Sequence, residues 1–297
     1  MLVQWYPGHM NKARKMMESD VKLVELVIEI VDARCPLSSR NPDIDRFAKT
    51  KSRLILLNKA DLADKNISEK WKEYFKKKGI SVVFLNSKNK EGLRNVLPAV
   101  LNVCSEKIKR NEAKGIKNQP IRAMVVGIPN VGKSTFINAF AGKNVTKTGD
   151  RPGVTTGKQW IKVNPQLELL DTPGILWPKF DDQEVAKRLA YIGSINDEIL
   201  VTEELAGDLL SFLYDHYFEY IASRYDISED TLKPLEEEET EFFCTKQSLL
   251  LSQVAIRLGC LKKGAEPDLF KASARFLDEF RGGKIGKITL ERPSDYE

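Results

Sequence analysis

The residues with the clearest chemical pattern form one short run, Gly127-Ile128-Pro129-Asn130-Val131-Gly132-Lys133-Ser134, which fits G-x-x-x-x-G-K-[ST]. Glycines in such a run let backbone N–H groups turn toward phosphate oxygens, and the lysine bridges the terminal phosphates. The hydroxyl of Ser134 is then placed to ligate Mg²⁺. We therefore predict a phosphate loop for a nucleotide, with an ordinary turn as the alternative interpretation. The residues expected to contact phosphate here are Asn130, Val131, Gly132, Lys133, Ser134 and Thr135.

A carboxylate follows the apolar run Leu167 to Leu170, in the sequence Asp171-Thr172-Pro173-Gly174. Because α/β sheets bind ligands at the carboxyl ends of their strands, this carboxylate should emerge beside the phosphate loop. We expect Asp171 to hold Mg²⁺ from its outer coordination sphere and the N–H of Gly174 to reach the γ-phosphate. The next residue is Ile175, whose side chain can neither orient nor polarise water. Hydrolysis must therefore recruit another group, or stay slow until a partner binds.

A third motif, Asn58-Lys59-Ala60-Asp61, follows the apolar run Leu54 to Leu57 and decides which base is bound. The carboxylate of Asp61 can accept from both N1–H and the 2-amino group of guanine, whereas adenine offers no such donor pair. We therefore predict GTP, not ATP, as the nucleotide. The sequence Asn86-Ser87-Lys88 also ends an apolar run, and it resembles the loop that contacts guanine O6 through backbone N–H groups. A polar loop without a ligand is the alternative for this last motif.

The order of the motifs is informative in itself. Ordinary small GTPases run from phosphate loop to switch threonine, D-x-x-G, N-K-x-D and S-A-K, whereas this chain runs NKAD, NSK, GIPNVGKS, PGVTT and DTPG. With this order, an N-terminal WYPGHM and a helical tail, the chain resembles the circularly permuted GTPases of the YlqF type, the ribosome biogenesis GTPase A family. The resemblance implies a Mg²⁺-dependent GTP hydrolase that binds immature large ribosomal subunits through rRNA. It also implies that the enzyme promotes a late step of large-subunit (50S) assembly and that the ribosome stimulates hydrolysis.

The resemblance also assigns residues that the motifs leave open. It implies that Thr155, with Thr156 as the alternative, ligates Mg²⁺ and contacts the γ-phosphate. Asn130 resembles the asparagine that helps related GTPases hold K⁺ beside the phosphates, although a simple turn residue is the other interpretation. His9 is implied as the group that positions the attacking water, for which an imidazole titrating near neutrality is suited, and an RNA-contacting or structural histidine is the alternative. The expected catalytic residues are thus His9, Lys133 and Thr155.

The elements that must position these residues are read from the apolar pattern. Short apolar runs alternate with polar, helix-prone stretches such as Ser68 to Lys78, which predicts β-α units and a parallel sheet. We predict helices over Leu93 to Ile108 and over Ser134 to Ala141, with the charged stretch KRNEAKGIKNQ as a linker between the two halves. The predicted strands are Leu26 to Val31, Leu54 to Leu57, Val82 to Leu85, Ala123 to Val126, and a pair, Trp160 to Val163 and Leu167 to Leu170, joined by a turn at Asn164 and Pro165.

From about Asp181 onward the spacing of apolar residues becomes helical. A length of 297 residues also favours two units with separate cores. We therefore expect an α/β circularly permuted P-loop GTPase domain over residues 1–180, with a mostly parallel sheet and helices on both faces. A smaller all-α domain that binds RNA and the ribosome is expected over residues 181–297. One helical stripe is predicted to contain Leu205, Leu209, Leu210, Leu213, Tyr217, Tyr220 and Ile221.

The charge of the chain fits a polyanionic partner but does not require one. The 47 Lys plus Arg exceed the 42 Asp plus Glu by only five, so a solvated surface is an equal alternative. Several weak contacts with rRNA phosphates are nevertheless expected, because such contacts bind the backbone without reading sequence. The basic residues expected to make them are Lys12, Arg14 and Lys15, then Lys107, Lys109, Arg110, Lys114 and Lys117, and finally Arg257, Lys262 and Lys263.

The remaining features predict a cytoplasmic protein. No apolar run approaches the roughly 20 residues of a membrane span, and the N-terminus does not resemble a secretory signal. The four cysteines, Cys35, Cys104, Cys244 and Cys260, are scattered, which fits buried thiols in a reducing compartment. We expect GTP or GDP and the large subunit as partners, no membrane or DNA partner, and a monomer.

Two other functional classes compete with this hypothesis. The first is a GTP-loaded binding module in which hydrolysis serves only to release the protein. A hydrolysis-dead variant that still binds GTP would separate that class from an enzyme. A membrane-trafficking or signalling GTPase is disfavoured because the sequence has no lipidation motif.

Overall fold

The computed structural model describes residues 8–116, 119–143, 145–146, 159–235 and 245–296. Their contacts divide the chain into two compact units. The α/β unit runs to Leu189 and includes the C-terminal residues from Thr289, and the helical unit spans Ala190–Ile288. This division differs from the expected boundary at residue 180, because residues 181–189 and 289–296 make their contacts with the α/β unit. Within the described residues, no helix has the length and apolar character needed to cross a membrane.

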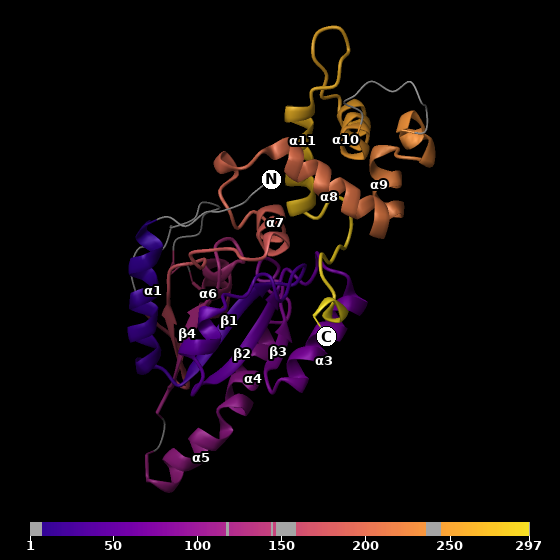
Figure 1. The fold of residues 1–297 in the computed structure, drawn as a ribbon. Coiled ribbons are helices and arrows are strands. Elements are labelled where there is room, and N and C mark those ends of the chain that lie inside the picture. Colours follow the sequence, from indigo (N-terminus) through magenta and orange to yellow (C-terminus); the bar gives the residue numbers. More distant parts are fainter. Residues whose placement is uncertain (1–7, 117–118, 144, 147–158, 236–244, 297) are drawn as a thin grey trace. The chain divides into compact units, whose positions relative to one another are not determined.

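One sheet forms the centre of the α/β unit, and within the described residues its strand order is β3-β2-β1-β4-β6-β5 (Figure 1). Neighbouring strands are parallel except for β5 and β6, which are antiparallel. The predicted parallel sheet and the predicted strand pair are thus confirmed. The strands are β1 (Leu26–Asp32), β2 (Ser52–Asn58), β3 (Ser81–Phe84), β4 (Ile121–Val126), β5 (Gln159–Asn164) and β6 (Leu167–Asp171).

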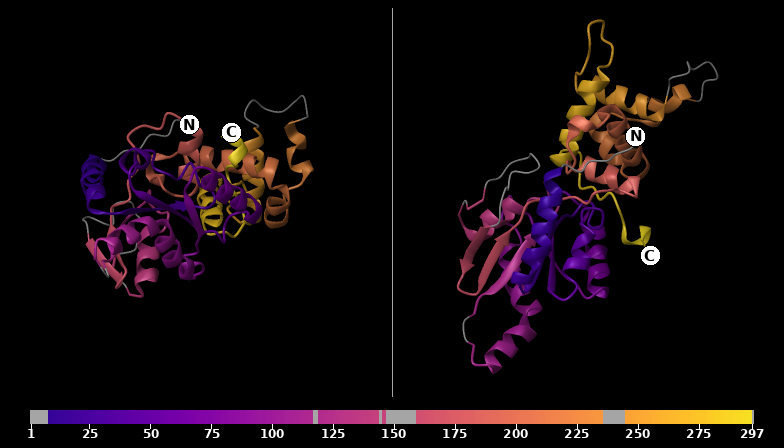
Figure 2. Two further views of the ribbon diagram at one scale, coloured as in Figure 1. Left: turned by 90° about the horizontal axis from the view of Figure 1, so that it is seen from below. Right: turned by 60° about the vertical axis from the view of Figure 1, so that its left-hand side comes forward.

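Helices cover both faces of this sheet. Parallel crossovers are right-handed, so the steps from β1 to β3 place helices on one face and the steps back through β4 to β6 place them on the other. Strand β1 is consequently buried along its whole length. Helix α1 lies alongside the sheet (Figure 2) and buries Met10 and Met17. The helices of the unit are α1 (Gly8–Asp20), α2 (Asp43–Phe47), α3 (Lys65–Lys77), α4 (Val96–Val103), α5 (Ser105–Ala113), α6 (Lys133–Ala141) and α7 (Gln183–Tyr191).

The stretch before β4 differs from its prediction. The expected single helix is divided into a 3-10 turn (Leu93–Asn95), α4 and α5, with a break at Cys104. Helix α5 continues to Ala113 and so includes the first part of the predicted linker. The sequence there consists of good helix formers, and Glu106 lies one turn before Arg110, which supports a helix more strongly than the high charge opposes it.

The helical unit contains α8 (Thr202–His216), α9 (Phe218–Tyr225), α10 (Lys246–Arg257) and α11 (Leu269–Arg281). The predicted stripe is correct over α8, where Leu205, Leu209 and their neighbours are buried. It does not form one helix, because Tyr217 leaves the helical conformation at φ −142° and α9 begins after it. Tyr220, predicted to be in the stripe, is 39% exposed.

Candidate nucleotide site

The predicted motifs meet at one edge of the sheet. Asp32, Asn58 and Asp171 are the last residues of β1, β2 and β6, and Gly127 follows β4 directly. These strands are parallel, so their carboxyl ends lie together. The chain proceeds from β1 toward β3 and then returns to β4 on the other side of β1, which makes this edge a topological switch point. Open α/β sheets bind their ligands at such points.

The phosphate loop has the backbone that its sequence predicts. Gly132 has φ +95°, in the left-handed region, and a Cβ built there would lie 2.3 Å from Asn58 Nδ2. Helix α6 begins at the next residue, Lys133, so its free N–H groups face the loop. Lys133 is buried, and a Cβ built on Gly174 would lie 3.0 Å from its Nζ. The lysine of the first motif and the glycine of the second are therefore in close contact.

The carboxylate of Asp171 lies in the same place and has capacity for a cation. It is 1% exposed, and its Oδ1 has no hydrogen-bond partner among the described residues. In the protein chain alone, burial raises the pKa of Asp171, and burial lowers the pKa of Lys133. A metal ion and anionic phosphates would favour the charged forms of both groups. A buried carboxylate oxygen without a partner among the described residues would suit Mg²⁺. Ser134, the other described residue that the sequence predicts as a ligand, lies in the first turn of α6.

Asn58 joins the phosphate loop to the guanine loop. It is 2% exposed, and its Nδ2 donates to Val131 O at 2.7 Å. Its Oδ1 accepts from the backbone N of Ser87 at 3.0 Å and from Ser87 Oγ at 2.8 Å. The side-chain amide is thus engaged by protein on both sides. Asn58, one of the predicted guanine residues, therefore holds two loops together.

Two other predicted guanine residues, Asp61 and Lys88, lie at the surface. The carboxylate of Asp61 is exposed and therefore accessible to a ligand. Lys88 is also exposed, and the backbone N of Lys88 donates to Asn86 Oδ1 at 3.1 Å, which shapes the turn after β3. Lys59 has φ +57°, a strained conformation for a lysine, and its Nζ lies 3.0 Å from Asp32 Oδ2.

Asp32 and Arg34 belong to this site but were missed from the sequence. The guanidinium of Arg34 donates from Nε to Asp32 Oδ1 at 2.9 Å and from Nη2 to Oδ2 at 2.8 Å. Both side chains are almost fully buried. Burial opposes the charge of Asp32, but Arg34 and Lys59 outweigh it and hold the pKa of Asp32 well below its ordinary value. A polar residue directly after an apolar run identified Asn58 and Asp171, and the same signal marks Asp32.

Two hydrogen bonds hold the segment after Asp171 against other parts of the α/β unit. Thr172 Oγ1 donates to Val125 O at 2.7 Å, and Asn41 Nδ2 donates to Ile175 O at 3.2 Å. The side chain of Ile175 is 1% exposed and therefore packs inward. Asn130 has φ +61°, which fits a residue that turns the loop around a ligand. His9 lies in the first turn of α1, but its side chain is outside the described residues, as are Thr155 and Thr156.

Comparisons with known proteins identify the family of this chain. A family model described as "50S ribosome-binding GTPase" matches residues 122–248. Ribosome biogenesis GTPase A from Bacillus cereus is 47% identical over 100% of this chain and 96% of its own length. The chain belongs to the ribosome biogenesis GTPase A family. It is therefore a GTP hydrolase, and the P-loop enzymes of this class generally use Mg²⁺.

Two solved structures of this family share the fold. The GDP-bound structure of TM YlqF is 30% identical, with a TM-score of 0.64 over 94% of this chain and 100% of that one. The GNP-bound structure of YlqF from T. maritima is also 30% identical, with a TM-score of 0.63 over 95% of this chain and 98% of that one. The predicted fold class and enzyme class are thus confirmed.

Proposed function

We propose that this GTPase binds immature large ribosomal subunits through rRNA and promotes a late step of 50S assembly, as a cytoplasmic monomer. The family membership supports a role in ribosome assembly. The observation that carries the rest is the combination of a phosphate loop, Asp171 and the guanine motif at one edge of the sheet with a buried Ile175 at the position where a water-orienting side chain is needed. A GTPase built in this way binds GTP well but hydrolyses it fast only after a partner completes the site.

In this proposal each motif has one task. Asp61 accepts from the guanine base, while Asn86, Ser87 and Lys88 line the base with the backbone of their turn. Lys133 bridges the terminal phosphates, and the N–H of Gly174 contacts the γ-phosphate. Mg²⁺ would be held by Ser134, Asp171 and Thr155, and it neutralises charge on the β- and γ-phosphates when bound. The loop residue Asn130 would help to hold K⁺ beside the phosphates, where its positive charge would offset theirs.

His9 is proposed as the group that the ribosomal particle brings into place. Its position in the first turn of α1 puts it next to the chain's N-terminal segment. Because the side chain of Ile175 packs inward, the attacking water receives no help from the segment after Asp171. An imidazole ordered over the γ-phosphate would supply it.

The helical unit offers the surface best suited to RNA. Arg257, Lys262 and Lys263 are exposed, and the two lysines lie in the loop that Leu261 and Pro267 close by an isolated bridge. Phe270, just after this loop, is 65% exposed. Exposed cations bind phosphates, and an exposed ring can stack on an unpaired base. By contrast, Arg14 and Lys107 from the other basic groups are paired with Asp43 and Glu25.

Co-sedimentation with immature and mature large subunits tests the proposed binding. A Lys262→Glu, Lys263→Glu variant should lose particle binding, and the loss should shrink as salt is raised because phosphate contacts are screened. The matched control is Lys76→Glu, Lys77→Glu, an equal charge change on exposed residues of α3. Equal binding by both variants would place the RNA contacts elsewhere.

Single-turnover hydrolysis across a particle titration tests the role of His9. The His9→Ala variant should bind GTP normally and lose roughly 10² to 10⁴ of the stimulated rate at saturating particles. If His9 only contacts RNA, the variant recovers its full rate once particles are saturating. A full maximal rate would therefore rule the histidine out as a catalytic group.

A further inference from the structure

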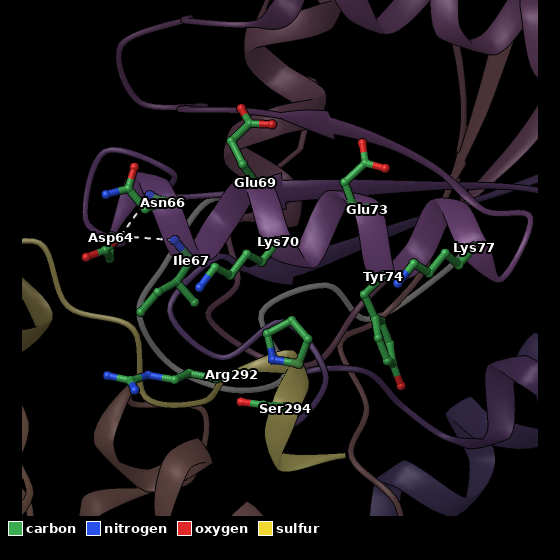
Figure 3. Close-up of a pocket in the computed structure, with 11 residues that line it drawn as sticks. Asp64, Asn66, Ile67, Glu69, Lys70, Glu73, Tyr74, Lys77, Arg292 and Ser294 are labelled. Carbon is green, nitrogen blue, oxygen red and sulfur yellow. Dashed lines mark hydrogen bonds between the residues drawn. The ribbon is translucent and has the colours of Figure 1, made fainter. Parts of the chain in front are cut away.

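The C-terminal segment, residues 289–296, returns to the α/β unit and buries a carboxylate there. The segment runs beside α3 (Figure 1), and Figure 3 shows Arg292 and Ser294 across an open groove from Lys70 and Tyr74 of that helix. Glu291 itself is 1% exposed. Burying a carboxylate without partners costs free energy, so the groups that bond Glu291 indicate its structural role.

Those partners lie in the loop that follows β1. Glu291 Oε1 accepts from the backbone N of Leu37 at 2.5 Å and of Ser38 at 3.0 Å. Its Oε2 accepts from Ser38 Oγ, from Tyr296 Oη at 2.7 Å and from Arg188 Nη1 at 3.2 Å. This single carboxylate therefore fixes two successive peptide groups of residues 34–38, which otherwise form a loop with few regular backbone bonds.

The same loop leads to the guanine motif through a short series of contacts. The backbone N of Leu290 donates to Arg34 O at 2.7 Å. The guanidinium of Arg34 holds Asp32 through two hydrogen bonds, and Asp32 Oδ2 lies 3.0 Å from Lys59 Nζ. Lys59 stands two residues before Asp61 with a left-handed backbone, a conformation that persists only when its surroundings hold it.

We propose that the C-terminal segment is a positioning element of the guanine site, with Glu291 fixing residues 34–38 and these fixing Lys59 and Asp61 through Arg34 and Asp32. The proposal rests on the proposed role of Asp61 in base recognition. Its consequence is that affinity for the guanine base depends on a residue at the opposite end of the chain, while the phosphate chemistry does not.

Glu291 also binds a residue that lies near the other point where the chain crosses between the two units. The chain leaves the α/β unit after Leu189 and re-enters it at Thr289. Arg188 and Glu291, which flank these two crossing points, pair with each other inside the α/β unit. Burial opposes the charge of Arg188, but the Glu291 carboxylate raises its pKa. The two chain segments that lead into and out of the helical unit are therefore held together within the α/β unit.

Glu291→Gln tests the proposal, because glutamine keeps the shape but puts a donor where an acceptor is needed and removes the charge that Arg188 meets. GDP and IDP affinities are measured by titration calorimetry; IDP lacks the 2-amino group that Asp61 is expected to bind. The wild type should prefer GDP by on the order of 10-fold, the factor that one charged hydrogen bond supplies. Glu291→Gln should reduce this preference by at least about threefold, raise KM for GTP and leave kcat unchanged.

Glu279→Gln is the matched control, because Glu279 is also a buried carboxylate held by an arginine and a tyrosine, Arg224 and Tyr225, in the helical unit. It should lower stability and leave the GDP to IDP preference intact. If Glu291→Gln fails to fold, Tyr296→Phe removes one donor to the same carboxylate and should shift the preference in the same direction.

A stable Glu291→Gln or Tyr296→Phe protein with the wild-type GDP to IDP preference would overturn the proposal. A change in kcat without a change in this preference would also overturn it, since the segment would then act on the phosphates. Asp61→Asn tests the role of Asp61 in base recognition separately from the role of Glu291. If that variant keeps its preference for GDP over XDP, the guanine-site assignment itself is wrong.

Discussion

Replacing Asn58 by alanine tests whether one side chain holds both the guanine loop and the phosphate loop in place. The substitution removes three hydrogen bonds, one to Val131 O and two from Ser87. It also leaves the carbonyl of Val131 and the N–H of Ser87 without their partners in a place that is closed to water, since Asn58 is 2% exposed. All three bonds join Asn58 to protein atoms of the two loops.

The magnitude follows from these contacts. A typical protein hydrogen bond contributes about 1 kcal/mol net, so three bonds predict a loss of roughly 3 kcal/mol in the free energy of unfolding. If the loops become disordered in the free protein, nucleotide binding must reorder them, and the same roughly 3 kcal/mol appears as about a 10²-fold weaker GDP affinity. The loss should be similar for GDP and IDP, because the base contacts themselves remain.

Urea unfolding and GDP titration measure the two quantities. Asn41→Ala is the control, because Asn41 is a buried asparagine of the same unit. Its Nδ2 donates to Ile175 O, and its Oδ1 accepts from the backbone N of Asp43. It should lower stability without a comparable loss of GDP affinity. An Asn58→Ala protein whose GDP affinity stays within about threefold of wild type would show that the two loops are held independently, and the reasoning would fail.

Four further outcomes are expected. Gly132→Ala should abolish nucleotide binding in a folded protein, because φ is +95° and the new Cβ would lie 2.3 Å from Asn58 Nδ2; retained GDP binding by calorimetry would contradict this backbone. Asp61→Asn should exchange GTP for XTP, whose 2-oxo group accepts where guanine donates, and competition titrations with both nucleotides decide it. Replacing K⁺ by Na⁺ should slow hydrolysis in the wild type and matter less in Asn130→Ala; identical rates in both salts would remove K⁺ from the mechanism. Asp32 has a pKa below its ordinary 3.8, so its contribution to stability is full above about pH 4 and is lost as pH falls through its folded-state value. The free energy of unfolding, measured with urea, should therefore differ between wild type and Asp32→Asn by a constant amount from about pH 7 to 5, and this difference should become smaller below about pH 4. A difference that grows in acid would argue against the ion pair.

The local pattern of the sequence was sufficient for the strands and for the motifs that end them. Each of these features is carried by contiguous residues, so propensity and spacing report it directly. Errors occurred where a local pattern was continued too far. The apolar stripe crosses Tyr217, where the backbone leaves the helix, and the charged stretch after Ile108 is helical up to Ala113.

The sequence by itself was sufficient to predict that this chain binds and hydrolyses GTP, because the phosphate loop and the motifs around Asp171 and Asp61 are defined by residue type at fixed spacing. Only the tertiary structure decided that Asn58 joins two loops and that Glu291 bonds the loop after β1, while Arg34 and Asp32 of that stretch contact each other and Lys59. Glu291 and Leu37 are 254 residues apart in the chain, and a buried glutamate is indistinguishable in sequence from a solvated one. Its role depends on which donors packing brings to it, and packing over such separations is a property of the whole fold.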